Sequence, residues 1–173
     1  MYEVDERDRV VPLETVPPSS AGAPLPLIMA DDWRVILAYY AASTQTWTGT
    51  PRIVDQIESD EPIALIRFDC RAHMFGPPND EAFHGHPLAN RGLQPYRAFR
   101  IENSSWIRKL ERINRVHEHH KSERFNELQH LIFAFHDSTF ECICKEFDVR
   151  TEHGSILDVT PAMIALLFEK QKK

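Results

Sequence analysis

Alternating apolar and polar residues predict one strand with particular clarity, over residues 64–74. The two parities are Ala64, Ile66, Phe68, Cys70, Ala72 and Met74 on one side, and Arg67, Asp69, Arg71 and His73 on the other. A period of two with one apolar side is typical of a strand buried on one face. We therefore expect a half-buried strand here.

Several other segments are rich in aromatic and β-branched residues and lie between turn-forming residues. They predict strands at 33–42, 97–102, 130–136 and 139–149, with a weaker candidate at 52–58. The segment 33–42 is apolar on both parities, so it is expected to be buried on both faces. Asp137 and Ser138 lie between the last two strong candidates and predict a hairpin turn.

Two segments have helical patterns instead. Apolar residues at spacings of three and four follow Ser104 and Ser105, which predicts an amphipathic helix over 105–117. A capping hydroxyl at Thr160 before Pro161 predicts the start of a closing helix of about ten residues. Strands in runs with few helices predict an α+β fold: a largely antiparallel sheet of about five or six strands, one central amphipathic helix and a C-terminal helix.

Two regions are rich in proline and lack a regular apolar pattern. Residues 1–26 hold five of the twelve prolines and little apolar periodicity, which predicts a flexible proline-rich arm before a single α+β domain at 27–173. Residues 76–95 hold three glycines and four prolines. A loop of this length is uncommon in a compact domain unless it has a function.

Composition narrows the classes of function. The 173 residues carry 20 basic and 26 acidic side chains, a formal charge of −6 that disfavours broad binding to nucleic acid or acidic membranes. No apolar stretch approaches the roughly 20 residues of a membrane span, and residues 1–11 are too charged for a signal peptide. Three cysteines form no disulfide framework. We expect a cytoplasmic protein without a membrane segment, and no glycine-rich motif predicts a nucleotide cofactor.

The long loop at 76–95 contains residues of the kind that bind metals. Glu81, His84 and His86 lie within six residues, and a glutamate three residues before a histidine shares its face on a helix. These are candidate ligands for a divalent metal such as zinc. The alternative is that the histidines are turn residues that hydrogen-bond to the backbone.

A second set of residues suggests catalysis. His136, Asp137 and Ser138 supply the residue types of a hydrolytic triad, although neighbours on an extended segment point to opposite faces. A turn in which Asp137 or Ser138 caps its own backbone is the favoured interpretation. Arg71 and His73 lie on the polar face of the strand at 64–74, where they either face solvent or line a cleft. The catalytic candidates are therefore His136, Asp137, His73 and Arg71.

Three strings in the middle of the chain resemble a small bacterial protein family of unknown function. They are Gly85-His86-Pro87-Leu88, Ser104-Ser105-Trp106-Ile107 with Asn114-Arg115-Val116-His117, and Phe135-His136-Asp137-Ser138-Thr139-Phe140-Glu141-Cys142. The resemblance covers roughly residues 63–149. It implies a bacterial cytosolic origin and brings no activity, cofactor or catalytic residue.

Two hypotheses about function follow. The first is a non-enzymatic interaction or accessory module that binds a protein partner or a second copy of itself, because no specific catalytic motif is present. The second is a small metal-dependent enzyme or metal-binding protein that uses the loop at 76–95.

Overall fold

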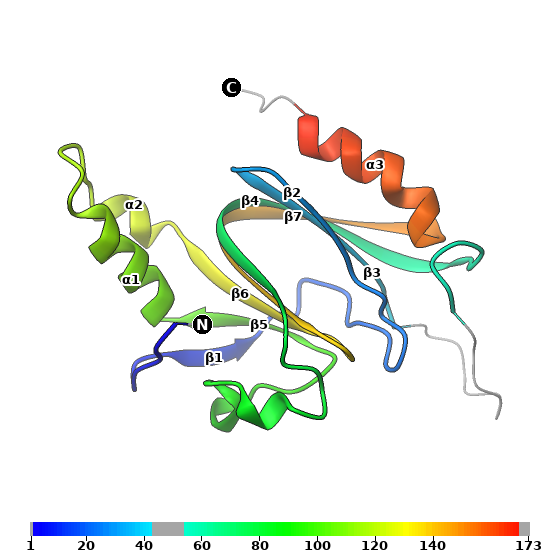
Figure 1. Ribbon diagram of the computed structural model, residues 1–173, viewed down its shortest axis with the longest axis horizontal. Helices are drawn as coiled ribbons and strands as arrows, with labels where there is room; N and C mark the ends of the chain where they lie inside the picture. The colour runs from blue at the N-terminus through cyan, green and yellow to red at the C-terminus, as the bar shows by residue number, and fades with distance from the viewer. Residues whose placement is uncertain (1, 43–53, 170–173) are drawn as a thin grey trace.

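The protein forms one antiparallel sheet with helices against its outer face (Figure 1). The computed structural model describes residues 2–42 and 54–169. The seven strands lie in the order β1-β5-β6-β7-β4-β3-β2. Their bounds are β1 (Arg9–Pro12), β2 (Leu27–Ala30), β3 (Arg34–Tyr40), β4 (Glu61–Gly76), β5 (Ala98–Glu102), β6 (Gln129–Ala134) and β7 (Thr139–Gly154). The helices are α1 (Ser105–Asn114), α2 (Glu123–Asn126) and α3 (Ile156–Phe168), with short 3-10 turns η1 (Phe83–Gly85) and η2 (Ala89–Arg91).

The predicted α+β class and antiparallel sheet are confirmed, and the sheet has seven strands rather than five or six. The two strands not predicted, β1 and β2, have four residues each and lie at the two ends of the sheet. Four residues are too few for a period of two to be recognised. Of the weak candidate at 52–58, residues 52–53 lie outside the described residues and 54–58 form no strand.

The two central strands determine the shape of the sheet. β4 and β7 have sixteen residues each and pair with one another from end to end. Irregular register between Phe68, Cys70 and Ala72 marks bulges, and a bulge bends a strand and increases its twist. Both strands curve strongly in Figure 1. The curvature brings the apolar face of β3 and β4 over that of β6 and β7.

The main core lies on this inner face. Its buried members include Leu37, Ile66, Phe68, Phe133 and Phe140. The outer face is covered in three places: by α3 over β3 and β4, by the loop at 77–97 over β5 and β6, and by α1 with the first residues of the chain over β7. Polar residues between the loop at 77–97 and α1 form a network that is described below.

The helix α1 begins where the sequence predicts. Ser104 is its N-cap, because the Ser104 hydroxyl accepts a hydrogen bond from the Ile107 amide (3.2 Å). The predicted start of the closing helix is wrong. α3 begins at Ile156, after a capping box in which Ser155 and Asp158 bond to each other's backbone amides, and Pro161 lies inside the helix. The capping box satisfies the first amides of α3, and Thr160 donates its hydroxyl proton to the Ile156 carbonyl.

The first 26 residues make contacts that the prediction of an arm did not anticipate. Tyr2, Asp8 and Val16 are buried, and β1 pairs with β5 at the edge of the sheet. Proline-rich composition gives no information about what such a segment packs against. Within the described residues, no helix has the length and hydropathy to cross a membrane.

Candidate functional site

A carboxylate lies buried on the outer face of the sheet and is surrounded by hydrogen-bond donors. Glu141 of β7 is 3% exposed. Its Oε1 lies 2.9 Å from Nε2 of His86, and its Oε2 lies 3.1 Å from Nε2 of His130 on β6. Tyr2 donates its hydroxyl proton to the same Oε2 at 2.8 Å. We call these four residues, together with Ser104, the closed network.

The backbone fixes the protons of the closed network. The Leu88 amide donates to Nδ1 of His86 (3.1 Å), so the proton of a neutral His86 ring is on Nε2 and is donated to Glu141. On the other side, Ser104 Oγ lies 2.9 Å from Nδ1 of His130. Since the Glu141 carboxylate can only accept, His130 Nε2 carries a proton and donates it to Glu141, and Nδ1 of the neutral ring accepts from the Ser104 hydroxyl. Each ring nitrogen in the network therefore has a partner.

Burial and hydrogen bonding act in opposite directions on Glu141. Burial alone raises the pKa of a carboxyl group, but the hydrogen bonds from His130 and His86 outweigh it and lower the pKa of Glu141 to about 2. Burial lowers the pKa of His130 below its ordinary value. Burial and the neighbouring Glu141 charge raise the pKa of Tyr2. The closed network thus holds one carboxylate among neutral donors.

A second network has similar residue types and lies at the turn between β6 and β7. His136 Nδ1 is 2.9 Å from Asp80 Oδ2, and the Tyr96 hydroxyl donates to the same oxygen. The side chains of His136 and Asp80 are 38% and 18% exposed. We call these three residues the open network, because no described residue bonds to Nε2 of His136. The hydrogen bonds from Tyr96 and His136 lower the pKa of Asp80, and the Asp80 carboxylate raises the pKa of Tyr96 to about 12.

The predicted metal ligands point in different directions. His86 faces inward to Glu141, whereas Glu81 and His84 are exposed. Within residues 2–42 and 54–169, no group of three or more histidine, cysteine, aspartate or glutamate side chains is arranged to hold a metal ion. For His86 there is a chemical reason: with Nδ1 accepting the Leu88 amide, Nε2 carries the proton and offers no lone pair to a metal. Metal binding by this loop stays a prediction.

The predicted catalytic residues are not brought together either. His136 pairs with Asp80, while Asp137 is exposed and Ser138 accepts a backbone bond from Phe135 (2.8 Å), as expected for a turn. Arg71 lies over the ring of Trp33 and 3.7 Å from Asp69, and the exposed His73 faces the ring of Phe140. The three cysteines are buried and free. Sequence reasoning therefore singled out His136, and the structure shows that its acidic partner is Asp80.

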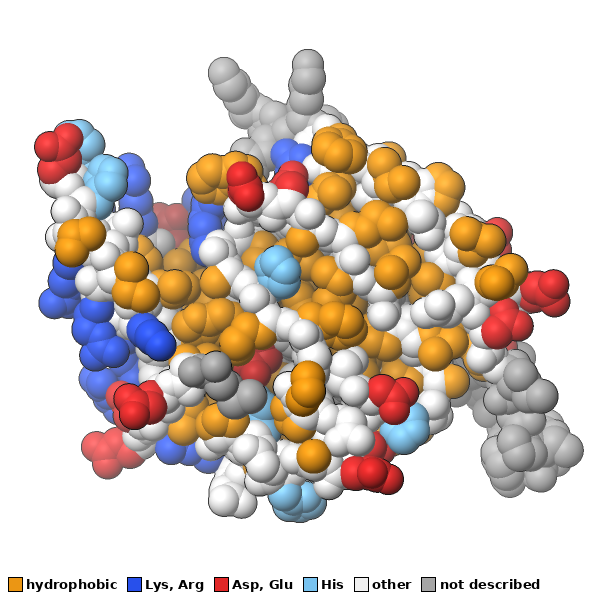
Figure 2. Space-filling view, viewed as in Figure 1, with side chains coloured by type: hydrophobic (Ala, Val, Ile, Leu, Met, Phe, Trp, Pro, Cys, Tyr) orange, Lys and Arg blue, Asp and Glu red, His pale blue; other side chains and the backbone are white. Residues whose placement is uncertain are grey.

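Apolar side chains form an exposed row along α3. Leu157, Ile164 and Phe168 are 56%, 47% and 73% exposed. Ile57 is also exposed, and the chain next to it is tied to the start of α3 by a hydrogen bond from the Leu157 amide to the Gln56 carbonyl (2.9 Å). We call these four residues the α3 surface; Figure 2 shows hydrophobic side chains along the upper right, where α3 lies.

Comparison with known proteins does not assign the chain to a family. No protein-family profile, curated protein or solved structure matches the chain. The three strings noted above therefore stay a resemblance. The function has to be argued from the geometry of the molecule itself.

Several residues of these sites were missed from the sequence. Tyr2 lies 139 positions from its partner Glu141, and no local pattern connects them. Glu141 did leave a signal, because it is a lone acid in the apolar run from Phe140 to Cys144. A charged residue in a buried strand is expected to have a partner. The closing helix was predicted to begin at Pro161, five residues later than α3 begins, so Leu157 fell outside it.

Proposed function

We propose that the protein is a non-enzymatic interaction module that associates with a second copy of itself through the α3 surface. The observation that carries this proposal is that α3 is apolar on both sides. Its inner side packs on β3 and β4 through residues such as Met163 and Leu166, while Leu157, Ile164 and Phe168 stay exposed on its outer side. A helix that is apolar all round is normally buried.

The size of the α3 surface supports a weak association. An exposed apolar patch of a few hundred Å² on a monomer commonly marks a binding site. The α3 surface has only four exposed apolar side chains on each copy, so we expect a weak dimer with a Kd of about 10–100 μM. This size fits a reversible contact between copies.

Symmetry favours a second copy as the occupant. In a two-fold pair each α3 packs against the other, so one row of apolar side chains is its own complement. The two acids at the ends of the row are already used within the chain. Asp158 caps α3 through Ser155, and Glu169 pairs with Arg67 (3.1 Å). Asp158 is therefore held by hydrogen bonds, and the charge of Glu169 is paired with that of Arg67.

Sedimentation velocity on the full chain tests the proposal. Over a concentration range of about 1 μM to 1 mM, the wild type is expected to change from monomer to dimer. Ile164→Glu places a charge in the centre of the contact and is expected to keep the protein monomeric throughout. Ile164 is 47% exposed, so thermal melts of this variant are expected to match those of the wild type.

The matched control is Val116→Glu. Val116 is 93% exposed and lies beyond the end of α1, so this variant makes the same change of charge outside the α3 surface. It is expected to dimerise like the wild type. A wild type that remains monomeric across the whole range, or an Ile164→Glu variant that dimerises as the wild type does, would refute self-association through α3.

A further inference from the structure

A pocket lies between α1, α2 and the ends of β5 and β6, away from the α3 surface. Its volume is about 450 Å³, within the range of small-molecule sites. Its lining includes three arginines, one acid and several apolar side chains: Arg7, Arg100, Arg108, Glu102, Ile107, Phe125 and Leu128. In Figure 2 lysine and arginine side chains gather on this side of the molecule, where Figure 1 places α1.

The arginines around the pocket outnumber the acids that pair with them. Asp5 pairs with both Arg7 (2.8 Å) and Arg108 (2.6 Å). Glu102 likewise pairs with both Arg9 (2.5 Å) and Arg100 (3.4 Å). Four guanidinium groups therefore share two carboxylates. The hydrogen bonds from Arg7 and Arg108 lower the pKa of Asp5, so Asp5 stays charged at neutral pH.

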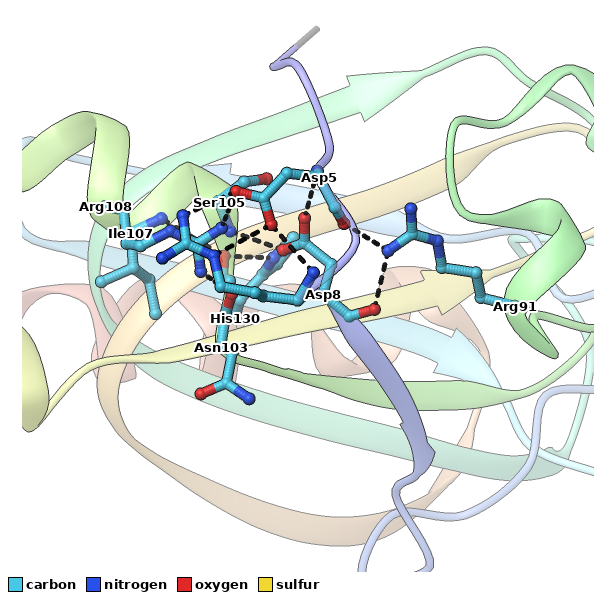
Figure 3. Close-up of polar contacts among 10 residues, drawn as sticks. Asp5, Asp8, Arg91, Asn103, Ser105, Ile107, Arg108 and His130 are labelled. Carbon is cyan, nitrogen blue, oxygen red and sulfur yellow. Dashed lines mark hydrogen bonds and ion pairs between the residues drawn. The ribbon is translucent and has the colours of Figure 1, made fainter.

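The other acids close by do not remove this excess at Arg100. Asp8 is buried and accepts the backbone amides of Asp5 and Ser105, next to the guanidinium of Arg91 (Figure 3). The exposed Glu6 carboxylate attracts the charge of Arg7. Arg100 has only the longer 3.4 Å contact with Glu102, which bonds more closely to Arg9. Among the arginines that line the pocket, Arg100 thus has the longest ion pair.

Part of the pocket lining is apolar. Ile107, Phe125 and Leu128 are each half-buried, so they present part of their surface to the pocket. The amides of Asn103 and Asn126 lie at its border. An apolar wall facing a few polar groups is the usual composition of a site for a small organic ligand.

We propose that this pocket binds an amphipathic organic monoanion, with its carboxylate on Arg100 and its apolar body on Ile107, Phe125 and Leu128. Guanidinium groups bind carboxylates through paired, charge-assisted hydrogen bonds. An inorganic anion would leave the apolar lining in water, and a neutral apolar molecule would make no ion pair with Arg100. This binding is independent of self-association through α3.

Isothermal titration of the full chain with phenylbutyrate tests the inference. Binding is expected with a Kd below about 1 mM. Arg100→Gln removes the charge but keeps a polar side chain at a position already exposed on β5, and is expected to weaken binding about tenfold. Phenylbutanol, which lacks the carboxylate, is expected to bind at least about tenfold more weakly than phenylbutyrate, and inorganic phosphate also much more weakly.

Two controls separate this site from the rest of the molecule. Arg150→Gln removes an exposed arginine of β7 outside the pocket, and Ile164→Glu disrupts the α3 surface; both are expected to bind phenylbutyrate as the wild type does. Absence of phenylbutyrate binding, or equal binding by Arg100→Gln, would overturn the inference. Phosphate binding as tight as phenylbutyrate would overturn the amphipathic class, and loss of binding in Ile164→Glu would place the ligand on α3 instead.

Discussion

The closed and open networks combine similar residues in two different settings. Each has one carboxylate that accepts from a histidine and from a tyrosine: Glu141 with His130 and Tyr2, and Asp80 with His136 and Tyr96. In the closed network both imidazole rings are fully buried. In the open network His136 keeps 38% of its side chain exposed.

This difference in burial gives the two networks different roles, although their residue types are similar. In the closed network the hydrogen bonds join the start of the chain, the loop at 76–95, β6, β7 and the N-cap of α1. Buried polar groups that satisfy one another make a structure specific, and the loss of one leaves the others unpaired. In the open network water can replace a missing partner. The closed network is therefore expected to serve stability, whereas the ring of His136 stays accessible to solvent.

The largest expected effect is that of Glu141→Ala. It leaves three donors, on Tyr2, His86 and His130, without their acceptor in a site that water does not reach. Breaking a buried charged network in this way costs about 3–5 kcal/mol of unfolding free energy. Chemical denaturation of wild type and variant measures the difference.

The control for this experiment is on the same strand. Glu146 is exposed on β7, and Glu146→Ala is expected to change the stability by less than about 0.5 kcal/mol. Equal costs for Glu141→Ala and Glu146→Ala would show that the closed network contributes no more than a surface charge.

Acid is expected to act on the closed network next most strongly. Folding depresses the pKa of Glu141 and of His130, so each contributes stability above its unfolded value that is lost as the pH falls. The loss is expected to begin below about pH 6.5 for His130 and to continue from about pH 4.5 towards pH 2 for Glu141, where it amounts to on the order of 3 kcal/mol. The raised pKa of Tyr2 gives the opposite sign: its contribution is present below about pH 10 and is lost above it.

Thermal melts from pH 7.5 to pH 3 measure this dependence, and Glu141→Gln isolates the carboxyl group. Glutamine does not titrate, so this variant is expected to lose the part of the slope below about pH 4.5. The same slope in wild type and Glu141→Gln would assign the acid sensitivity to other groups.

The parts of the fold that the sequence predicts are those whose signals are local. β4 and β7 show alternating or continuous apolar patterns over more than ten residues, and α1 has a capping serine and a clear apolar side. The start of α3 was missed although its capping box, Ser155 and Asp158, is also local. Thr160 and Pro161 gave a competing start signal, and a proline is tolerated inside this helix.

The sites were harder to predict because their contacts are not local. His86 was recognised as a residue of interest, but its partner Glu141 is 55 positions away. His136 was considered together with its neighbour Asp137, whereas in the fold its ring bonds to Asp80, which is 56 positions away. Chemistry-bearing residues can be found in a single sequence, but their pairing depends on strand order and loop path, which local patterns do not determine.

The smallest expected effect is that of Asp80→Asn in the open network. The amide oxygen can still accept from Tyr96, and solvent is available to His136, so the melting temperature at pH 7 is expected to fall by about 2 °C or less. Folding lowers the pKa of Asp80, so its contribution is present at neutral pH and is lost as the pH falls. Below the folded pKa of Asp80 the wild-type side chain is also neutral, and the difference between the two proteins is expected to shrink. Thermal melts of wild type and Asp80→Asn at pH 7 and at pH 3 measure this difference in melting temperature. A difference that grows in acid, or a loss of stability as large as that of Glu141→Ala, would show that the open network has the same structural role as the closed one.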